Sequence, residues 1–130
     1  MESIISNLVY NLHMDLAKKK CEPCEGGTKP FTVSEAKKYL SLLKTEWELV
    51  EEPSSTSASQ SEFKIRKKYK FETFRQAINF INKVADLAEA EDHHPNIFNS
   101  YNHVTITLFT HSIGGLSVND FILASKIELL

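Results

Sequence analysis

The sequence predicts an α+β domain: a four-stranded antiparallel sheet with its helices packed on one face. The sequence contains two pairs of strand-like segments, and each pair can form a hairpin. The first pair is 47–50 and 63–71, and the second is 97–101 and 104–110. A helical segment at 72–91 separates the two pairs, and further helical segments stand before the first and after the second. Hairpins divided by helices are typical of this class, because the sheet then buries one face beneath the helices.

Length and composition fit one globular domain. The chain has 130 residues, of which 42% are hydrophobic and 25% charged, and its net charge is −2. With this net charge, the protein has no overall positive field that would attract nucleic acid. We interpret the local basic run 64–70 as the solvated face of a strand, with a phosphate-binding patch as the alternative. No apolar run approaches the ~20 residues of a membrane span.

The first 29 residues form an expected helical extension ahead of a domain at 30–130. Residues 3–19 place apolar side chains on one helical face, and Pro and Gly residues then end the helix. This stretch carries acids and no Arg before residue 16, which argues against a secretory or transit peptide and favours a cytoplasmic protein, with the nucleus as the alternative. Cys21 and Cys24 make a lone C-x-x-C, which we interpret as a reduced pair in a turn, with metal or redox use as the alternative.

The first half of the domain has a capped helix and a long hairpin. Thr32 and Glu35 form a predicted capping box, and apolar residues at helical spacing follow it. Residues 47–50 and 63–71 read as strands. Between them, residues 52–61 form an inserted polar loop whose Ser-rich composition cannot bury much apolar surface.

The second half opens on the strongest helix, 72–91, and closes on a capped one. Apolar residues cover about half the circumference of helix 72–91, more than one sheet contact requires. It is therefore either a deep core helix or one that packs on its own sheet with one edge and on another subunit with the other. The strands 97–101 and 104–110 meet in a tight turn near Asn102. Ser117 and Asp120 then cap a last helix that runs to about residue 130.

The candidate chemistry lies in the stretch Glu89-Ala-Glu-Asp-His93-His94-Pro95 and in His111. Histidine exchanges protons near neutral pH, since its unperturbed pKa is about 6.5. Proline disfavours a helical backbone at the residue before it, so we expect the histidine pair where a helix ends. Two histidines with a carboxylate can also bind iron or zinc. Adjacent histidines on an extended backbone tend to point apart, however, which argues against a metal.

The spacing of these residues resembles that of the pterin-4a-carbinolamine dehydratase family. An acid (Glu89) is followed after three residues by His-His-Pro, after five more by Tyr101, after nine by His111 and after eight by Asp120. The similarity continues through 105–108, Thr110, the Gly-Leu-Ser of 115–117 and Trp47. It spans about residues 30 to 130.

The resemblance implies a hydro-lyase that dehydrates 4a-hydroxytetrahydropterin to quinonoid dihydropterin and so recycles pterin cofactor. It implies His93, His94 and His111 as catalytic residues, with His94 and His111 as the proton-transfer pair and His93 positioning the pterin. Glu89 and Asp92 are the implied supporting acids at the substrate.

Pro95 is implied to hold the backbone of the histidine pair, whereas Asp120 has a competing role as the helix cap. No metal or organic cofactor is implied. The expected partners are the pterin and further copies of the chain, in a dimer or tetramer formed through helix 72–91 and a sheet edge. An alternative function in the family is an interaction protein that stabilises dimers of a transcription factor.

Overall fold

The computed structural model describes residues 16–23, 28–54, 57 and 59–130. Among these residues, no helix is long and apolar enough to cross a membrane. The element order after the N-terminal extension agrees with the order predicted from the sequence. The elements are α2 (Val33–Leu40), β1 (Glu48–Pro53), β2 (Ser61–Lys70), α3 (Phe74–Glu91), β3 (Asn96–Ser100), β4 (His103–Leu108), the 3₁₀ turn η1 (His111–Ile113) and α4 (Val118–Ile127).

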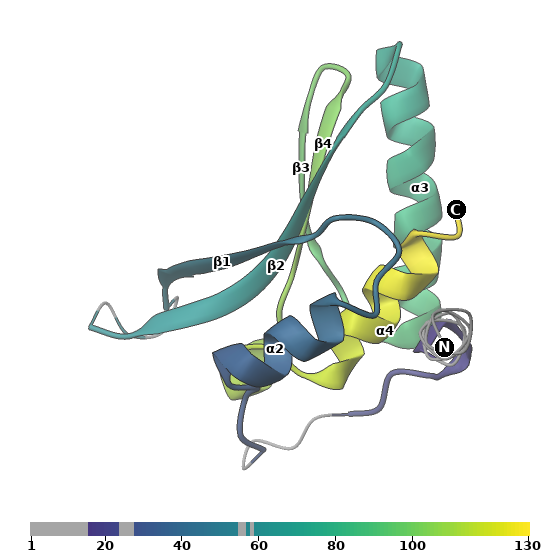
Figure 1. Cartoon of the computed structure of the whole chain (residues 1–130). Coiled ribbons are helices and arrows are strands. Elements are labelled where there is room, and N and C mark those ends of the chain that lie inside the picture. Colours follow the sequence, from purple (N-terminus) through teal and green to yellow (C-terminus); the bar gives the residue numbers. More distant parts are fainter. Residues whose placement is uncertain (1–15, 24–27, 55–56, 58) are drawn as a thin grey trace, which may run out of the picture.

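The four strands form one antiparallel sheet in the order β1-β2-β4-β3 (Figure 1). The helices lie on one side of it, which confirms the predicted fold class. Ile65, Ile106 and Leu108 are fully buried on the helix-facing side, and Ile65 stands opposite Leu108 in the register. The alternation of apolar and polar residues along β4 therefore gives the sheet one face for the core.

The helix caps and the hairpin connection follow local sequence signals. Thr32 and Glu35 make both bonds of the capping box that begins α2. Strand pairing runs further into the polar loop than predicted, because Pro53 pairs with Ser61. The Ser54 hydroxyl also donates to buried Glu62 at 2.9 Å. The connection between paired strands is thus shorter than the predicted loop 52–61.

Helix α3 has a buried line and two different edges. Ala77, Val84 and Ala88 are buried along its length. At one edge, the Phe80 ring packs on those of Tyr69 and Phe71, with centroids 4.6 and 5.2 Å away. The other edge carries exposed Phe74, half-buried Ile78 and exposed Ala85. The wide apolar arc predicted for this helix is therefore only partly covered by the chain's own core.

The interpretation of 64–70 as a solvated strand face is wrong for two of its basic residues. Lys64 is buried, its ammonium 3.5 Å from the Glu52 carboxylate. Arg66 also bonds Glu52, and its Nε donates to the Thr107 hydroxyl at 2.9 Å. These cross-strand partners replace water, so only the later part of the run, at Lys68 and Lys70, is exposed.

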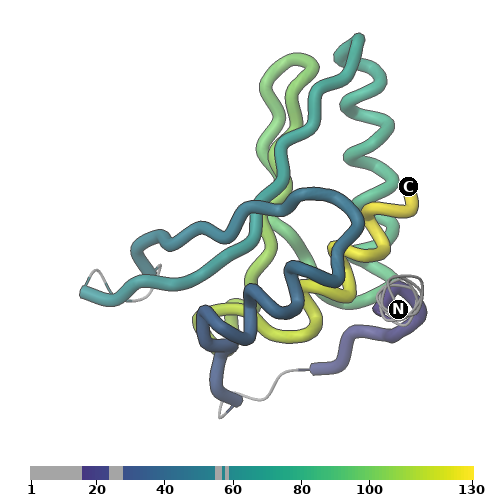
Figure 2. The backbone as a smooth tube through the Cα atoms, viewed as in Figure 1, coloured from purple at the N-terminus to yellow at the C-terminus, as the bar shows by residue number. Residues whose placement is uncertain are grey.

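The N-terminal extension is described only in part. The predicted helix 3–19 and Cys24 lie largely or wholly outside the described residues. Residues 16–18 are helical, Leu16 is buried in the core, and Cys21 is buried as well. Figure 2 shows residues 16–23 passing beside the chain where α3 ends and α4 begins, which brings this segment close to the candidate site.

Candidate active site

The histidine pair leaves the end of α3, as Pro95 predicted. The helix ends at Glu91, and Asp92 takes a left-handed conformation (φ 50°) as the C-cap. The backbone N–H of His93 still reaches the Ala88 carbonyl at 3.2 Å. Such a left-handed cap satisfies the last carbonyls while it turns the chain sharply. His93 and His94 therefore stand on a backbone that is fixed on both sides, by the cap and by the proline.

His111 reaches the same region from a different element. The predicted strand 104–110 ended just before it, but β4 already ends at Leu108, and His111 begins the 3₁₀ turn η1. Thr110 pairs with Gly115 and closes this turn, and Gly114 has a φ of 68°, where a side chain would be strained. A Cβ on Gly115 would approach Pro30 to 2.7 Å. The two glycines explain why the strand pattern breaks here.

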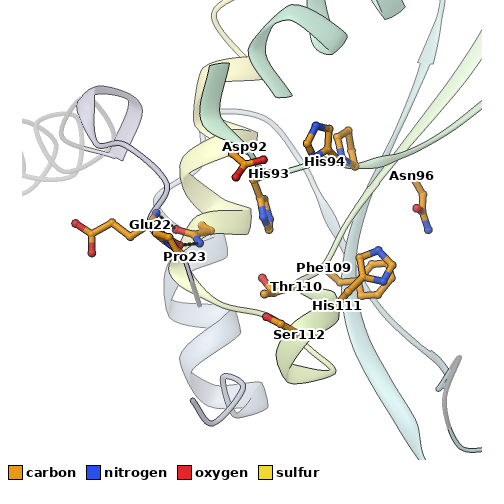
Figure 3. A pocket seen from close by; sticks show the side chains of 12 residues that line it. Glu22, Pro23, Asp92, His93, His94, Asn96, Phe109, Thr110, His111 and Ser112 are labelled. Carbon is orange, nitrogen blue, oxygen red and sulfur yellow. Dashed lines mark hydrogen bonds between the residues drawn. The ribbon is translucent and has the colours of Figure 1, made fainter. Parts of the chain in front are cut away.

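The three histidines line one pocket of about 330 Å³ (Figure 3). Residues from the N-terminal extension, the end of α3, the start of β3, the turn after β4 and the first turn of α4 complete it. The full lining consists of Glu22, Pro23, Asp92, His93, His94, Pro95, Asn96, Phe109, Thr110, His111, Ser112 and Asn119.

His93 is held by a buried carboxylate. Its Nε2 lies 2.7 Å from Oδ1 of Asp120, whose side chain is fully buried. The other oxygen of Asp120 accepts from the Thr110 hydroxyl at 2.9 Å and from the Ser117 N–H at 3.0 Å. The last bond belongs to the predicted capping box of α4, which is present. Asp120 thus caps the helix and orients His93, two roles that the sequence presented as competitors.

His94 has a looser environment. Its Nε2 lies 3.2 Å from Oε1 of Glu89, one turn back on α3, and both side chains are largely in solvent, at 53% and 80% exposure. An exposed pair of this kind contributes little free energy. The imidazole of His94 is therefore accessible both to solvent and to a molecule bound in the pocket.

His111 rests on an aromatic ring backed by charge. Its centroid lies 4.0 Å from that of Phe109, and the Lys64 ammonium stands 4.3 Å from the same Phe109 ring. Lys64 pairs with Glu52, and a hydrogen bond from Arg66 holds the pKa of that carboxyl below its usual range. The ring that supports His111 is thus fixed from behind by a charged network across β1 and β2.

Other predicted residues divide into those at the pocket and those away from it. Asp92 and Pro95 line the pocket, whereas Glu89 contacts His94 without lining it. Tyr101 is 67% exposed at the turn between β3 and β4, at the opposite end of those strands. Among the described residues, no group of three or more His, Cys, Asp or Glu side chains could hold a metal ion.

Sequence reasoning missed the wall formed by Glu22, Pro23 and Asn119. The side-chain oxygen of Asn119 accepts from the Glu22 N–H at 3.0 Å, and its amide donates to the Glu22 carbonyl. The C-x-x-C of Cys21 and Cys24 was visible as a motif, but its interpretations, a turn or metal or redox use, did not include a pocket wall. No local signal links Glu22 to Asn119, which is 97 residues away.

The fold and the pocket together define a small α+β protein that gathers three imidazoles around one ligand-sized cavity. Residues 29–130 match the family described as Pterin 4 alpha carbinolamine dehydratase. The chain belongs to this pterin-4a-carbinolamine dehydratase family.

Relatives from bacteria agree with this assignment. A protein of Rickettsia bellii is 46% identical over 115 residues, which cover 88% of this chain and 93% of the relative. One of Alkaliphilus metalliredigens is 40% identical over 114 residues, with 88% and 94% covered. Both carry the name "Putative pterin-4-alpha-carbinolamine dehydratase". A solved structure from Brucella melitensis, described as a transcriptional coactivator/pterin dehydratase, has 34% identity and a TM-score of 0.65, and covers 78% of this chain and 97% of its own.

Proposed function

We propose that the protein is a hydro-lyase that converts 4a-hydroxytetrahydropterin to quinonoid dihydropterin and water by histidine acid/base catalysis. One observation carries the proposal: imidazoles from two separate parts of the chain, His93 and His94 after α3 and His111 after β4, line a single pocket. Family membership supports the substrate class.

The reaction needs a proton donor and a proton acceptor at neighbouring atoms of the pterin. Hydroxide is a poor leaving group, so an acid protonates the 4a-oxygen as the C4a–O bond breaks and water departs. A base takes the proton of N5, whose electron pair forms the C4a=N5 bond. One proton is given and one is taken, so the protein returns to its starting charge. Histidine suits both tasks near neutral pH.

The environments of the three rings support a division of labour. His93 is tied to buried Asp120 through Nε2, which leaves Nδ1 to bond and position the pterin. His94 and His111 are exposed and carry no such buried partner, so they are the proton-transfer pair in this proposal. Glu89, whose Oε1 lies 3.2 Å from Nε2 of His94, is the supporting acid beside this ring.

Turnover of synthetic 4a-hydroxytetrahydropterin by the purified wild-type chain tests the proposal. We expect formation of quinonoid dihydropterin, followed by its absorbance, well above the spontaneous rate. Because histidines alone carry the proposed acid/base steps, turnover should be the same before and after treatment with EDTA. A rate no higher than the spontaneous one would contradict the enzyme function, and loss of turnover with EDTA that zinc or iron restores would contradict the metal-free mechanism.

A second candidate function is an interaction protein that stabilises dimers of a transcription factor. The description of the Brucella melitensis relative as a transcriptional coactivator supports this second candidate function. This function has no physical need for the histidine-lined pocket. It would therefore survive replacement of His94 and His111, whereas dehydration would not.

We further propose that the chain forms homo-oligomers through two surfaces. β3 is an edge strand of the sheet and carries exposed Ile97 and Phe98. Edge strands with apolar side chains pair readily with a second copy. The open edge of α3, with Phe74 and Ile78, supports a second contact. A dimer uses one of these surfaces, and a tetramer uses both.

Replacing Phe98 or Phe74 with Asp should give smaller species in sedimentation velocity, since each change puts a charge into an apolar contact. The fold should survive, because both side chains are exposed, at 66% and 47%. Val33→Asp is the matched control, since Val33 is exposed and apolar but lies at the start of α2, away from both surfaces. A monomeric wild type would exclude the proposal.

A further inference from the structure

The N-terminal segment that walls the pocket is firmly attached. Leu16 and Cys21 are buried, the Cys21 N–H bonds Oε2 of Glu91 at 3.4 Å, and the Cys21 thiol bonds the Asn119 carbonyl at 3.4 Å. Asn119 holds the Glu22 backbone by two further bonds. These contacts place the segment between the end of α3 and the start of α4 (Figure 2). The Glu22 backbone and the Asn119 side chain that holds it therefore form a fixed wall of the pocket, which we call the Glu22–Asn119 ridge.

A second hollow of about 410 Å³ lies against the same ridge. Glu22 and Asn119 line both this hollow and the histidine pocket, so the two are neighbours that share one wall. A chain attached to a molecule in the histidine pocket would pass Glu22 and Asn119 to enter the second hollow. The lining of the second hollow is Lys19, Lys20, Glu22, Val118, Asn119 and Ile122.

The lining of the second hollow combines two cationic residues and one acidic residue with two apolar residues. Lys19 and Lys20 are exposed, and neither makes an ion pair with another residue in the described part of the chain. Glu22 is the one acidic residue of the lining, and its carboxylate points away from the histidines (Figure 3). Val118 and Ile122, both on α4, provide apolar side chains that can contact the aliphatic part of a ligand's side chain. Unpaired ammonium groups beside a hollow attract an anionic group.

We propose that the natural substrate is a pterin whose side chain crosses the Glu22–Asn119 ridge and ends in an anion, a phosphate ester or a carboxylate, bound by Lys19 and Lys20. The inference rests on the proposed dehydration and specifies its substrate class. The chemistry of the ring fits, because the C6 substituent of a pterin is next to N5. The side chain therefore leaves from the edge of the ring at which the histidines work.

The test compares 4a-hydroxytetrahydropterins that differ only in side chain: neutral, phosphate-ended and carboxylate-ended. Wild type should show a KM roughly three- to tenfold lower for an anionic side chain, as expected for one or two exposed charge pairs. The preference should shrink at high salt, which screens such pairs. The phosphate and carboxylate arms distinguish the two anions. Lys19→Gln/Lys20→Gln should abolish the preference, whereas Lys18→Gln, in the same basic run but outside the hollow, should keep it.

Equilibrium binding of fully oxidised, fluorescent pterins with the same three side chains separates this inference from the catalytic proposal, because these compounds do not react. If wild type turns over none of the substrates, dehydration fails, while tighter binding of the anionic pterins that Lys19→Gln/Lys20→Gln removes still supports the subsite. Equal binding of neutral and anionic pterins by wild type would overturn the inference. Equal loss of preference in Lys18→Gln and the double variant would overturn it as well.

Discussion

Replacing His111 with alanine is expected to lower the turnover of 4a-hydroxytetrahydropterin by about 10²–10⁴-fold, the usual loss for a well-placed acid or base. The melting temperature should change little, because the imidazole is exposed and packs on the Phe109 ring from the solvent side of the pocket. His94→Ala should have an effect in the same range. The double variant should lose less than the product of the two factors, since groups that act together are not additive.

His103→Ala is the matched control for these variants. His103 is also exposed and lies on β4, but at the strand end next to the turn with β3, away from the pocket. Its carbonyl accepts from the Asn99 amide, a bond that alanine keeps. Turnover and stability should both equal wild type. Wild-type turnover in the His94→Ala/His111→Ala double variant would refute the proton-transfer assignment.

Replacing Asp120 with alanine should affect folding and chemistry together. The His93 Nε2, the Thr110 hydroxyl and the Ser117 N–H all lose the Asp120 carboxylate as a partner, and the loss of a buried hydrogen-bond partner costs ~1–3 kcal/mol. We therefore expect the free energy of unfolding, measured by urea titration, to fall by about 3 kcal/mol. Turnover under conditions that keep the protein folded should fall by about 10²-fold, because misplacement of a positioning group of about 1 Å has that effect.

A variant in the capping box of α2 is a control that separates the two expected effects of Asp120→Ala, the loss of stability and the loss of turnover. Thr32→Ala removes a cap of the same type, in which Thr32 accepts from the Glu35 N–H at 3.2 Å, but this box contacts no histidine. It should lower stability by about 1 kcal/mol and leave turnover unchanged. If Asp120→Ala merely destabilised the protein in the same way, with normal turnover of the folded fraction, the assignment of Asp120 to His93 would be wrong.

Local signals made most of the fold predictable. The caps at Thr32 and Ser117 depend on side chains three residues apart, and both are present. The end of α3 follows from Pro95, which acts on its immediate neighbour. The alternation along β4 puts Val104, Ile106 and Leu108 on one side of the strand, and all three are fully buried. In each case the residues that determine the feature are close together in the sequence, so the feature can be predicted from the sequence alone.

The parts that were missed depend on contacts between distant residues. Lys64 looked solvated because its partners are distant in the sequence: Glu52 lies on β1, and Phe109 directly follows β4. Asn119 gave no sign that it would hold the Glu22 backbone. The predicted competition between two roles of Asp120 was resolved by burial, which lets its two oxygens serve different partners at once. A sequence pattern alone cannot supply the geometry that decides such cases.

Asp120 both caps α4 and bonds His93. The orientation of His93 in the pocket therefore depends on whether the first turn of α4 is intact. The first turn of a helix is where fraying begins, since its N–H groups lack partners within the helix. Any opening of the α4 start removes the bond that orients His93, even while the sheet and core persist. Loss of activity on warming would then precede loss of the fold, and a ligand that steadies the imidazole of His93 would in turn steady the start of α4.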